Sequence, residues 1–145
     1  MEAAAQTSNT AAQKGVPMTA WTSGELDKIG AAEELQIASV RRDGTLRNPV
    51  TIWAVRHGDD LYVRSVNGRT SAWFRSTRVR HEGHIRAGGV DKNVTFVDAD
   101  PDIDDQIDAA YRTKYRRYAA SIIRSIVSPE ARSTTIKLVP RSTSS

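Results

Sequence analysis

Apolar and polar residues alternate along the middle of the chain, with a period of two residues in three consecutive segments. These segments are residues 35–39, 50–55 and 61–66. A period of two is typical of strands that bury one face. Residues favoured in tight turns separate the segments, for example Asp43-Gly44. Short turns between alternating segments predict an antiparallel meander.

The rest of the chain carries further strand and helix patterns. Strands are predicted over 83–87, 93–97 and 134–139, and helical segments over 22–30, 70–76 and 102–124. The first helix opens on Thr22 and Glu25, which have the spacing of a capping box. The longest segment repeats apolar residues at three and four positions, which predicts one amphipathic helix. About six strands with two or three helices predict an α+β fold, with the strands in a closed or partly closed barrel.

The length of the chain suits a single domain, which we place at residues 18–140. Residues 1–17 are mostly small and polar, so they cannot bury enough surface to offset the entropy of ordering. We therefore expect disordered tails at 1–17 and 141–145. The first tail is either native or a remnant of cloning. The same two origins are open for a segment that resembles a protease-cleavage sequence, Leu138-Val139-Pro140-Arg141-Ser142.

Composition narrows the expected partners. The net charge of +4, from 21 basic and 17 acidic residues, can attract anions. Aromatic and basic residues do not interleave as they do in nucleic-acid-binding motifs, and no apolar run approaches the roughly 20 residues of a membrane span. The chain has no cysteine, which excludes disulfides and thiol catalysis. We expect a cytoplasmic protein that binds neither a membrane nor nucleic acid.

The meander carries several motifs in a defined order. They are Arg42-Asp43-Gly44, Arg47-Asn48-Pro49, Asn67-Gly68 and the aromatic pair Trp73-Phe74. In this order they resemble the flavin-binding, pyridoxamine-phosphate-oxidase-like split-barrel superfamily, in particular its deazaflavin-dependent nitroreductase-like branch. The last helix adds Ala109-Ala110-Tyr111-Arg112 and then Lys114-Tyr115. With these residues the chain is similar to the bacterial domain-of-unknown-function 2255 family of that superfamily.

The resemblance implies a small antiparallel split β-barrel that binds flavin mononucleotide (FMN) or a deazaflavin. It further implies a homodimer and an oxidoreductase that acts on a small organic substrate. The matching positions would bind the cofactor: Trp53 and Trp73 as walls of the ring pocket, Arg47, Arg64 and Arg75 at the phosphate, and Ser65 and Gly68 beside them. A guanidinium group suits phosphate because it presents parallel donors with a permanent charge.

Arg64 occupies a position that requires a counter-charge. It shares a strand face with Tyr62 and Val66, so its guanidinium group has partly apolar neighbours, among which an unpaired charge is costly. Two kinds of partner would satisfy it. One is a phosphate group held by Arg64, Ser65, Gly68 and Arg75. The other is an internal carboxylate, such as Asp60 or Glu82.

The chain departs from the deazaflavin branch directly after the aromatic pair, where Arg75-Ser76-Thr77-Arg78 replaces an Asn and a Pro segment. Two alternatives therefore stay open. One is a cofactor-independent cyclase, isomerase or hydrolase of small-molecule or natural-product metabolism, in which Tyr62, His57 or His84 supplies acid–base chemistry. The other is a non-catalytic module that binds an anionic metabolite.

Two further polar clusters are interpreted as structural. His81-Glu82-Gly83-His84 lacks the histidine spacing of helical zinc sites, and the aspartates between 98 and 108 lack the glycine of a calcium loop. We expect no metal site. Tyr111, Lys114 and Tyr115 could reach one ligand from the last helix, but we expect the tyrosines to pack and Lys114 to reach solvent.

Overall fold

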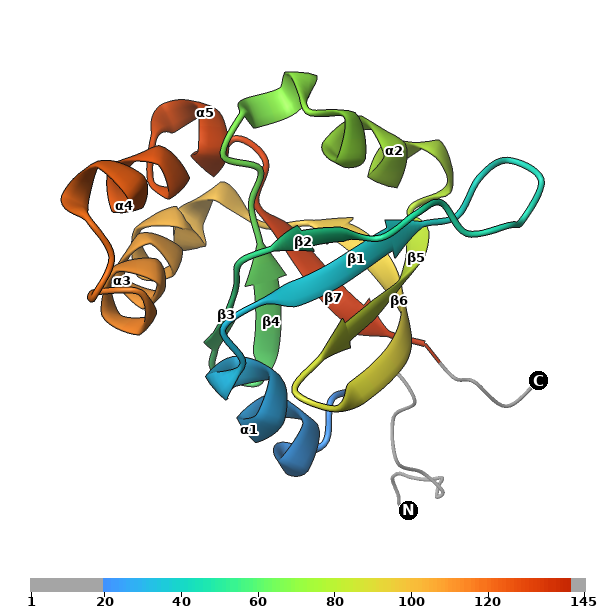
Figure 1. Ribbon diagram of the computed structural model, residues 1–145, viewed down its shortest axis with the longest axis horizontal. Helices are drawn as coiled ribbons and strands as arrows, with labels where there is room; N and C mark the ends of the chain where they lie inside the picture. The colour runs from blue at the N-terminus through green and yellow to red at the C-terminus, as the bar shows by residue number, and fades with distance from the viewer. Residues whose placement is uncertain (1–19, 142–145) are drawn as a thin grey trace, which may run out of the picture.

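The computed structural model describes residues 20–141, which form an antiparallel sheet curled into a barrel with helices around it (Figure 1). Within this range the sheet has seven strands in the order β2-β1-β5-β6-β7-β4-β3. The strands are β1 (Leu35–Ser39), β2 (Val50–Ile52), β3 (Ala54–His57), β4 (Asp60–Val63), β5 (Glu82–Ala87), β6 (Val90–Asp98) and β7 (Ile136–Pro140). Apart from Arg141, the predicted tails lie outside the described residues.

The barrel closes at Trp53. β2 and β3 stand at opposite ends of the strand order, yet Trp53 alone separates them in the chain. β2 pairs with β1, and β3 pairs with β4. The predicted strand 50–55 is therefore two strands, one at each end of the sheet. With this correction to the strand limits, the predicted α+β split barrel is confirmed.

Helices cover the barrel on several sides (Figure 1). They are α1 (Ser23–Ala31), α2 (Ala72–Arg80), α3 (Asp104–Lys114), α4 (Ala120–Ile126) and α5 (Pro129–Arg132), with short 3₁₀ turns η1 (Gly68–Thr70) and η2 (Pro101–Ile103). α1 begins with the predicted capping box, in which the Thr22 hydroxyl accepts from Glu25 N–H and the Glu25 carboxylate accepts from Thr22 N–H. None of the helices between residues 20 and 141 has the length and apolar character needed to cross a membrane.

The single helix predicted over 102–124 is wrong, because the chain bends after Lys114. α3 ends there, the following residues form a turn, and α4 begins at Ala120. Apolar residues continue at spacings of three and four through the turn. Periodicity alone therefore does not show the bend.

Packing against the barrel accounts for the bend. Tyr115 and Tyr118 both place their rings against Trp53 from the turn, with ring centroids 3.8 and 4.9 Å away. α4 then folds back, so that the carbonyl of Ile126 accepts a hydrogen bond from the guanidinium group of Arg64 at 3.1 Å. A straight helix would carry Ile126 away from this position.

Two clusters of buried side chains form the core. The larger fills the barrel, where residues of β1, β4, β5, β6 and β7 face one another and α1 closes one end. The Trp21 indole, just before α1, donates to the carbonyl of Leu138 on β7 at 2.9 Å. The smaller cluster lies between the β3–β4 hairpin and the helices α3 and α4, and it contains Val55, Tyr62, Ile107, Tyr111, Tyr115 and Ile126. The predicted packing of Tyr111 and Tyr115 is thereby confirmed.

Candidate functional site

Two neighbouring cavities lie along β2, and we refer to them together as the β2 groove. The first has a volume of about 340 Å³ and the second of about 270 Å³, and Trp73 borders both. Trp53 and Ile122 border the first cavity, whereas Arg41 and Arg47 border the second. The groove therefore has an aromatic and apolar end and a cationic end.

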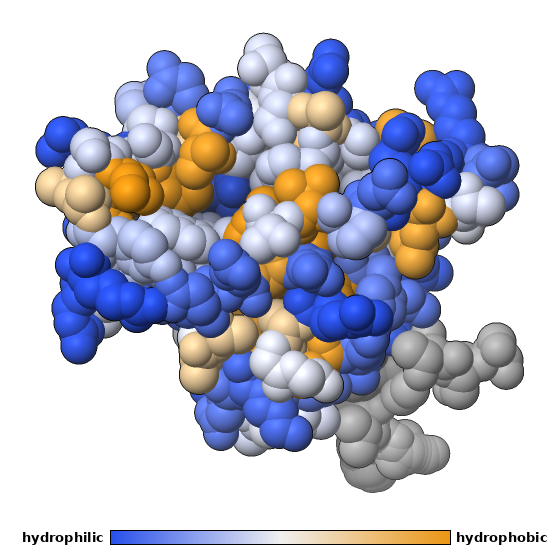
Figure 2. Space-filling view, viewed as in Figure 1, coloured by the Kyte–Doolittle hydropathy of each residue, from blue (hydrophilic) through white to orange (hydrophobic). Residues whose placement is uncertain are grey.

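At the aromatic end of the groove, each of the two tryptophans packs against another aromatic ring. Trp53 is stacked on Tyr115, with an interplanar angle of 4°. Trp73 lies at the start of α2, where its ring meets Phe74 edge-on at a centroid distance of 6.4 Å. Hydrophobic residues gather on this face of the molecule over α4 and around β2 (Figure 2). A flat apolar ligand would find rigid walls here.

The cationic end lies where the hairpin after β1 returns to the barrel. The Arg41 guanidinium group donates to the carbonyl of Leu46 at 2.8 Å and to the hydroxyl of Thr45 at 3.2 Å. Arg47 is anchored by its backbone N–H on the carbonyl of Ser39, and its side chain is exposed. Of residues 20–141, none that is acidic borders this cavity. The charged side chains that border this cavity are therefore all positive, and the carboxylate of Asp43 lies close enough to Arg41 to interact with its charge.

Arg64 is satisfied inside the protein. Its side chain is fully buried, with Nη1 2.5 Å from Asp108 Oδ1 and Nη2 3.4 Å from Asp104 Oδ1. A threonine hydroxyl and two backbone carbonyls accept its other hydrogen bonds. The counter-charge is thus an internal carboxylate pair, although not the predicted Asp60 or Glu82. All of its donors are used, so we leave Arg64 out of the phosphate site proposed below.

The other members of the predicted anion site lie apart from the groove. Ser65 is buried, and its backbone N–H donates to the Thr134 hydroxyl at 2.8 Å. Gly68 has a φ of +75°, and a Cβ added there would lie 3.2 Å from Cβ of Glu130, so its close approach is to α5. Arg75 is exposed on α2 and borders neither cavity. The structure brings Trp53, Trp73 and Arg64 to one cavity and Arg47 to the next.

The three candidate acid–base residues lie in two places. The rings of His57 and Tyr62 are 6.5 Å apart between centroids, whereas His84 on β5 contacts Asp91 on β6. Burial, with a smaller effect from the carboxylate of Asp60, raises the pKa of Tyr62. Tyr62 therefore stays protonated at neutral pH. The three side chains do not form one acid–base site.

Two cationic residues differ from the sequence prediction: Arg41 was not singled out, and Lys114 was expected to reach solvent. Arg41 borders the groove beside Arg47, and the Arg41-Arg42 doublet before the turn is the signal that could have indicated it. Lys114 does not extend into solvent as expected. It is half-buried, and its Nζ donates to the carbonyl of Ala54 at 2.6 Å. Ala54 is 60 residues away in the chain, so no local pattern predicts this contact.

The fold and the groove define the chain as a split-barrel protein. Over residues 25–138 it matches the family described as "Uncharacterized protein conserved in bacteria (DUF2255)", and it belongs to that family. The resemblance inferred from the motifs is thereby confirmed. No curated protein matches the chain.

Several solved structures share the fold at low sequence identity. An F420 reductase is 15% identical with a TM-score of 0.53, over 86% of this chain and 97% of its own. The conserved hypothetical protein Rv2991 from Mycobacterium tuberculosis is 10% identical with a TM-score of 0.53, over 87% and 83% of the two chains. The heme storage protein HutZ from Vibrio cholerae is 14% identical with a TM-score of 0.50, over 85% and 91%. At these identities the similarity shows the fold alone.

Proposed function

We propose that the β2 groove binds a flavin-type cofactor, FMN or a deazaflavin, and that the protein is an oxidoreductase for a small organic substrate. The division of the groove into an aromatic end and a cationic end carries this proposal. A flavin-type cofactor has the same division, because a flat ring system is joined to phosphate. When bound, it supplies hydride transfer, and the protein holds and orients it.

The residues at each end fit their part of such a molecule. Trp53 is already fixed by its stack on Tyr115, and a wall that is rigid before binding loses little entropy when a ligand arrives. Trp73 would bound the ring from α2. Arg47 and Arg41 would hold the phosphate, since guanidinium–phosphate hydrogen bonds are charge-assisted.

The fold relatives support a cofactor without selecting one. One is named an F420 reductase and another a heme storage protein. Both names refer to proteins that handle flat, conjugated groups on the same barrel. The small-molecule substrate and a cytoplasmic location belong to the same proposal.

We also propose that a second copy of the chain covers the face of the molecule around β2 and α4. Leu46, Val50, Val66 and Ile122 are large hydrophobic residues that are 37% to 50% exposed, and a homodimer would remove them from water. Sedimentation at micromolar concentration is expected to show a species of twice the 16.0 kDa chain mass. A monomer at all concentrations would contradict the dimer but not the groove.

Titration of the pure protein with FMN, a deazaflavin and inorganic phosphate tests the cofactor proposal. Saturable binding of FMN or the deazaflavin is expected, with a loss of roughly tenfold or more in Trp73→Ala and in Arg47→Ala. Arg75→Ala is the control, because it removes the same charge from an exposed position outside the groove. A folded wild type that binds neither cofactor would overturn the proposal. That result would favour a cofactor-independent enzyme or an anion-binding module.

A further inference from the structure

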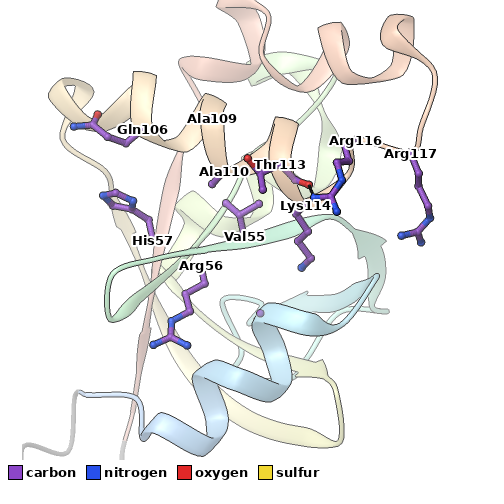
Figure 3. A pocket seen from close by; sticks show the side chains of 11 residues that line it. Val55, Arg56, His57, Gln106, Ala109, Ala110, Thr113, Lys114, Arg116 and Arg117 are labelled. Carbon is purple, nitrogen blue, oxygen red and sulfur yellow. Dashed lines mark hydrogen bonds between the residues drawn. The ribbon is translucent and has the colours of Figure 1, made fainter.

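A second cavity, of about 750 Å³, lies between α3, β3 and the end of α1 (Figure 3). The ionisable side chains around it are all basic: Arg56, His57, Lys114, Arg116 and Arg117. Within the described range, 20–141, no acidic residue borders it. The side chains of Lys114 and Arg56 point from α3 and β3 toward α1 (Figure 3).

Lys114 differs from two of the arginines in the way its charge is compensated. Arg56 lies 2.9 Å from the carboxylate of Asp27, and Arg117 pairs with a glutamate that precedes β1. No carboxylate of residues 20–141 lies within ion-pair distance of Lys114, whose Nζ donates to the carbonyl of Ala54. An ammonium group has three N–H donors, so two of them remain for a ligand.

The surroundings of Lys114 disfavour its charge. Burial lowers its pKa to about 8, because the ammonium group loses hydration. The titratable and charged groups that share the cavity are Arg56 and His57 from β3, and Arg116 and Arg117 from the turn after α3. None of them is acidic. At neutral pH most of the lysine is still charged. An anion in the cavity would therefore be stabilised by a cation with free donors.

We propose that this cavity binds an anionic small molecule and that Nζ of Lys114 holds its phosphate or carboxylate oxygen. The volume lies within the range of small-molecule sites. Among the described residues, none borders both this cavity and the β2 groove. The inference is therefore independent of the proposed cofactor site.

An NMR titration of isotope-labelled full-length protein tests the proposal, with inorganic phosphate and citrate as probes and chloride at equal ionic strength as the reference. Wild type is expected to show saturable shifts at the amides of Thr113 and Lys114. Lys114→Met should weaken binding by about tenfold or more. Arg112→Met is the matched control, because it removes an exposed cation of the same helix that does not border the cavity, and it should bind as wild type does.

The outcomes distinguish binding of phosphate, binding of a carboxylate, and no binding. Saturation by phosphate supports a phosphorylated ligand, and saturation by citrate alone supports a carboxylate. Absence of saturable binding by wild type, or equal binding by folded Lys114→Met, overturns the proposal. If the variant does not fold, the ¹³Cε shift of Lys114 in wild type is titrated with pH instead. A pKa that rises when phosphate or citrate is added supports the site, and a pKa that neither anion changes overturns it.

Discussion

Nη1 of Arg64 lies 2.5 Å from Oδ1 of Asp108, and the two side chains are only 0% and 10% exposed. The pair joins the end of β4 to the middle of α3. A shift of α3 along the barrel would leave both charges buried without a partner, which is strongly unfavourable. The pair therefore fixes the position of α3, and with it the tyrosines that hold Trp53 at the groove.

Removing the carboxylate of Asp108 is expected to destabilise the protein strongly. Asp108→Ala leaves Arg64 buried with the more distant carboxylate of Asp104, and we expect a loss of about 3–5 kcal/mol in the free energy of unfolding. Urea unfolding followed by circular dichroism measures it. Asp105→Ala is the control, since Asp105 also pairs with an arginine, Arg132, but is 89% exposed. Its loss should stay below about 1 kcal/mol, and equal losses in both variants would contradict the role given to the buried pair.

The requirement for a counter-charge at Arg64 could be predicted from the sequence, but its partner could not. Alternation along the strand places Arg64 beside apolar residues, and the cost of an unpaired buried charge follows from general chemistry. Asp108, however, is 44 residues away, on a helix whose docking is decided by tertiary packing. For the same reason Trp53 and Trp73 could be assigned to one pocket only through the family resemblance.

The hydroxyl of Tyr115 provides a second test of how the helices hold the barrel. It lies 2.9 Å from the carbonyl of Glu33, to which it donates, and it accepts from the backbone N–H of Ala54 at 3.3 Å. Tyr115→Phe keeps the ring on Trp53 but removes these contacts, and a loss of about 1–3 kcal/mol is expected. Tyr118→Phe is the control, because no hydrogen bond of its hydroxyl is formed within residues 20–141, and its effect should stay within about 0.5 kcal/mol. Thermal or urea unfolding distinguishes the two, and a neutral Tyr115→Phe would contradict the prediction.

The lowered pKa of Lys114 predicts how the stability of the protein changes with pH. Its pKa in the folded protein is about 8, below the ordinary value of 10.5. Between these values the unfolded chain binds the proton and the folded chain does not, so the contribution of Lys114 to the free energy of unfolding rises with pH. Below pH 8 the cost of the buried charge is fully present.

The comparison of wild type with Lys114→Met isolates this effect, because other titrating groups cancel in the difference. The free energy of unfolding of wild type minus that of the variant should rise from pH 8 to pH 10.5 and be flat below pH 7. Urea unfolding across this range measures it. A difference that falls with pH, or does not change, would contradict the lowered pKa.

The limits of the sequence prediction differ between strands and helices for a physical reason. Each strand alternates locally, so most strands could be placed from their own residues. The division of 50–57 at Trp53 depends on barrel closure, and the bend after Lys114 depends on what Tyr115 and Tyr118 contact. Both features are set by residues distant in the chain, and the local period is the same with or without them.

Gly83 lies in the barrel where there is no room for a single added methyl group. A Cβ added there would lie 2.3 Å from the carbonyl oxygen of Ala38 and 2.5 Å from Cζ of Phe96. Gly83→Ala should therefore destabilise by about 1–3 kcal/mol or more, since overpacking forces the backbone to move. Gly24→Ala is the control in α1, where nothing lies within 4 Å; the helix gains up to about 1 kcal/mol from the lower backbone entropy of alanine. Because the nearer obstacle is backbone, Gly83→Ala combined with Phe96→Leu should be no more stable than Gly83→Ala alone, and recovery in this double variant would show that the Phe96 ring is the obstacle instead.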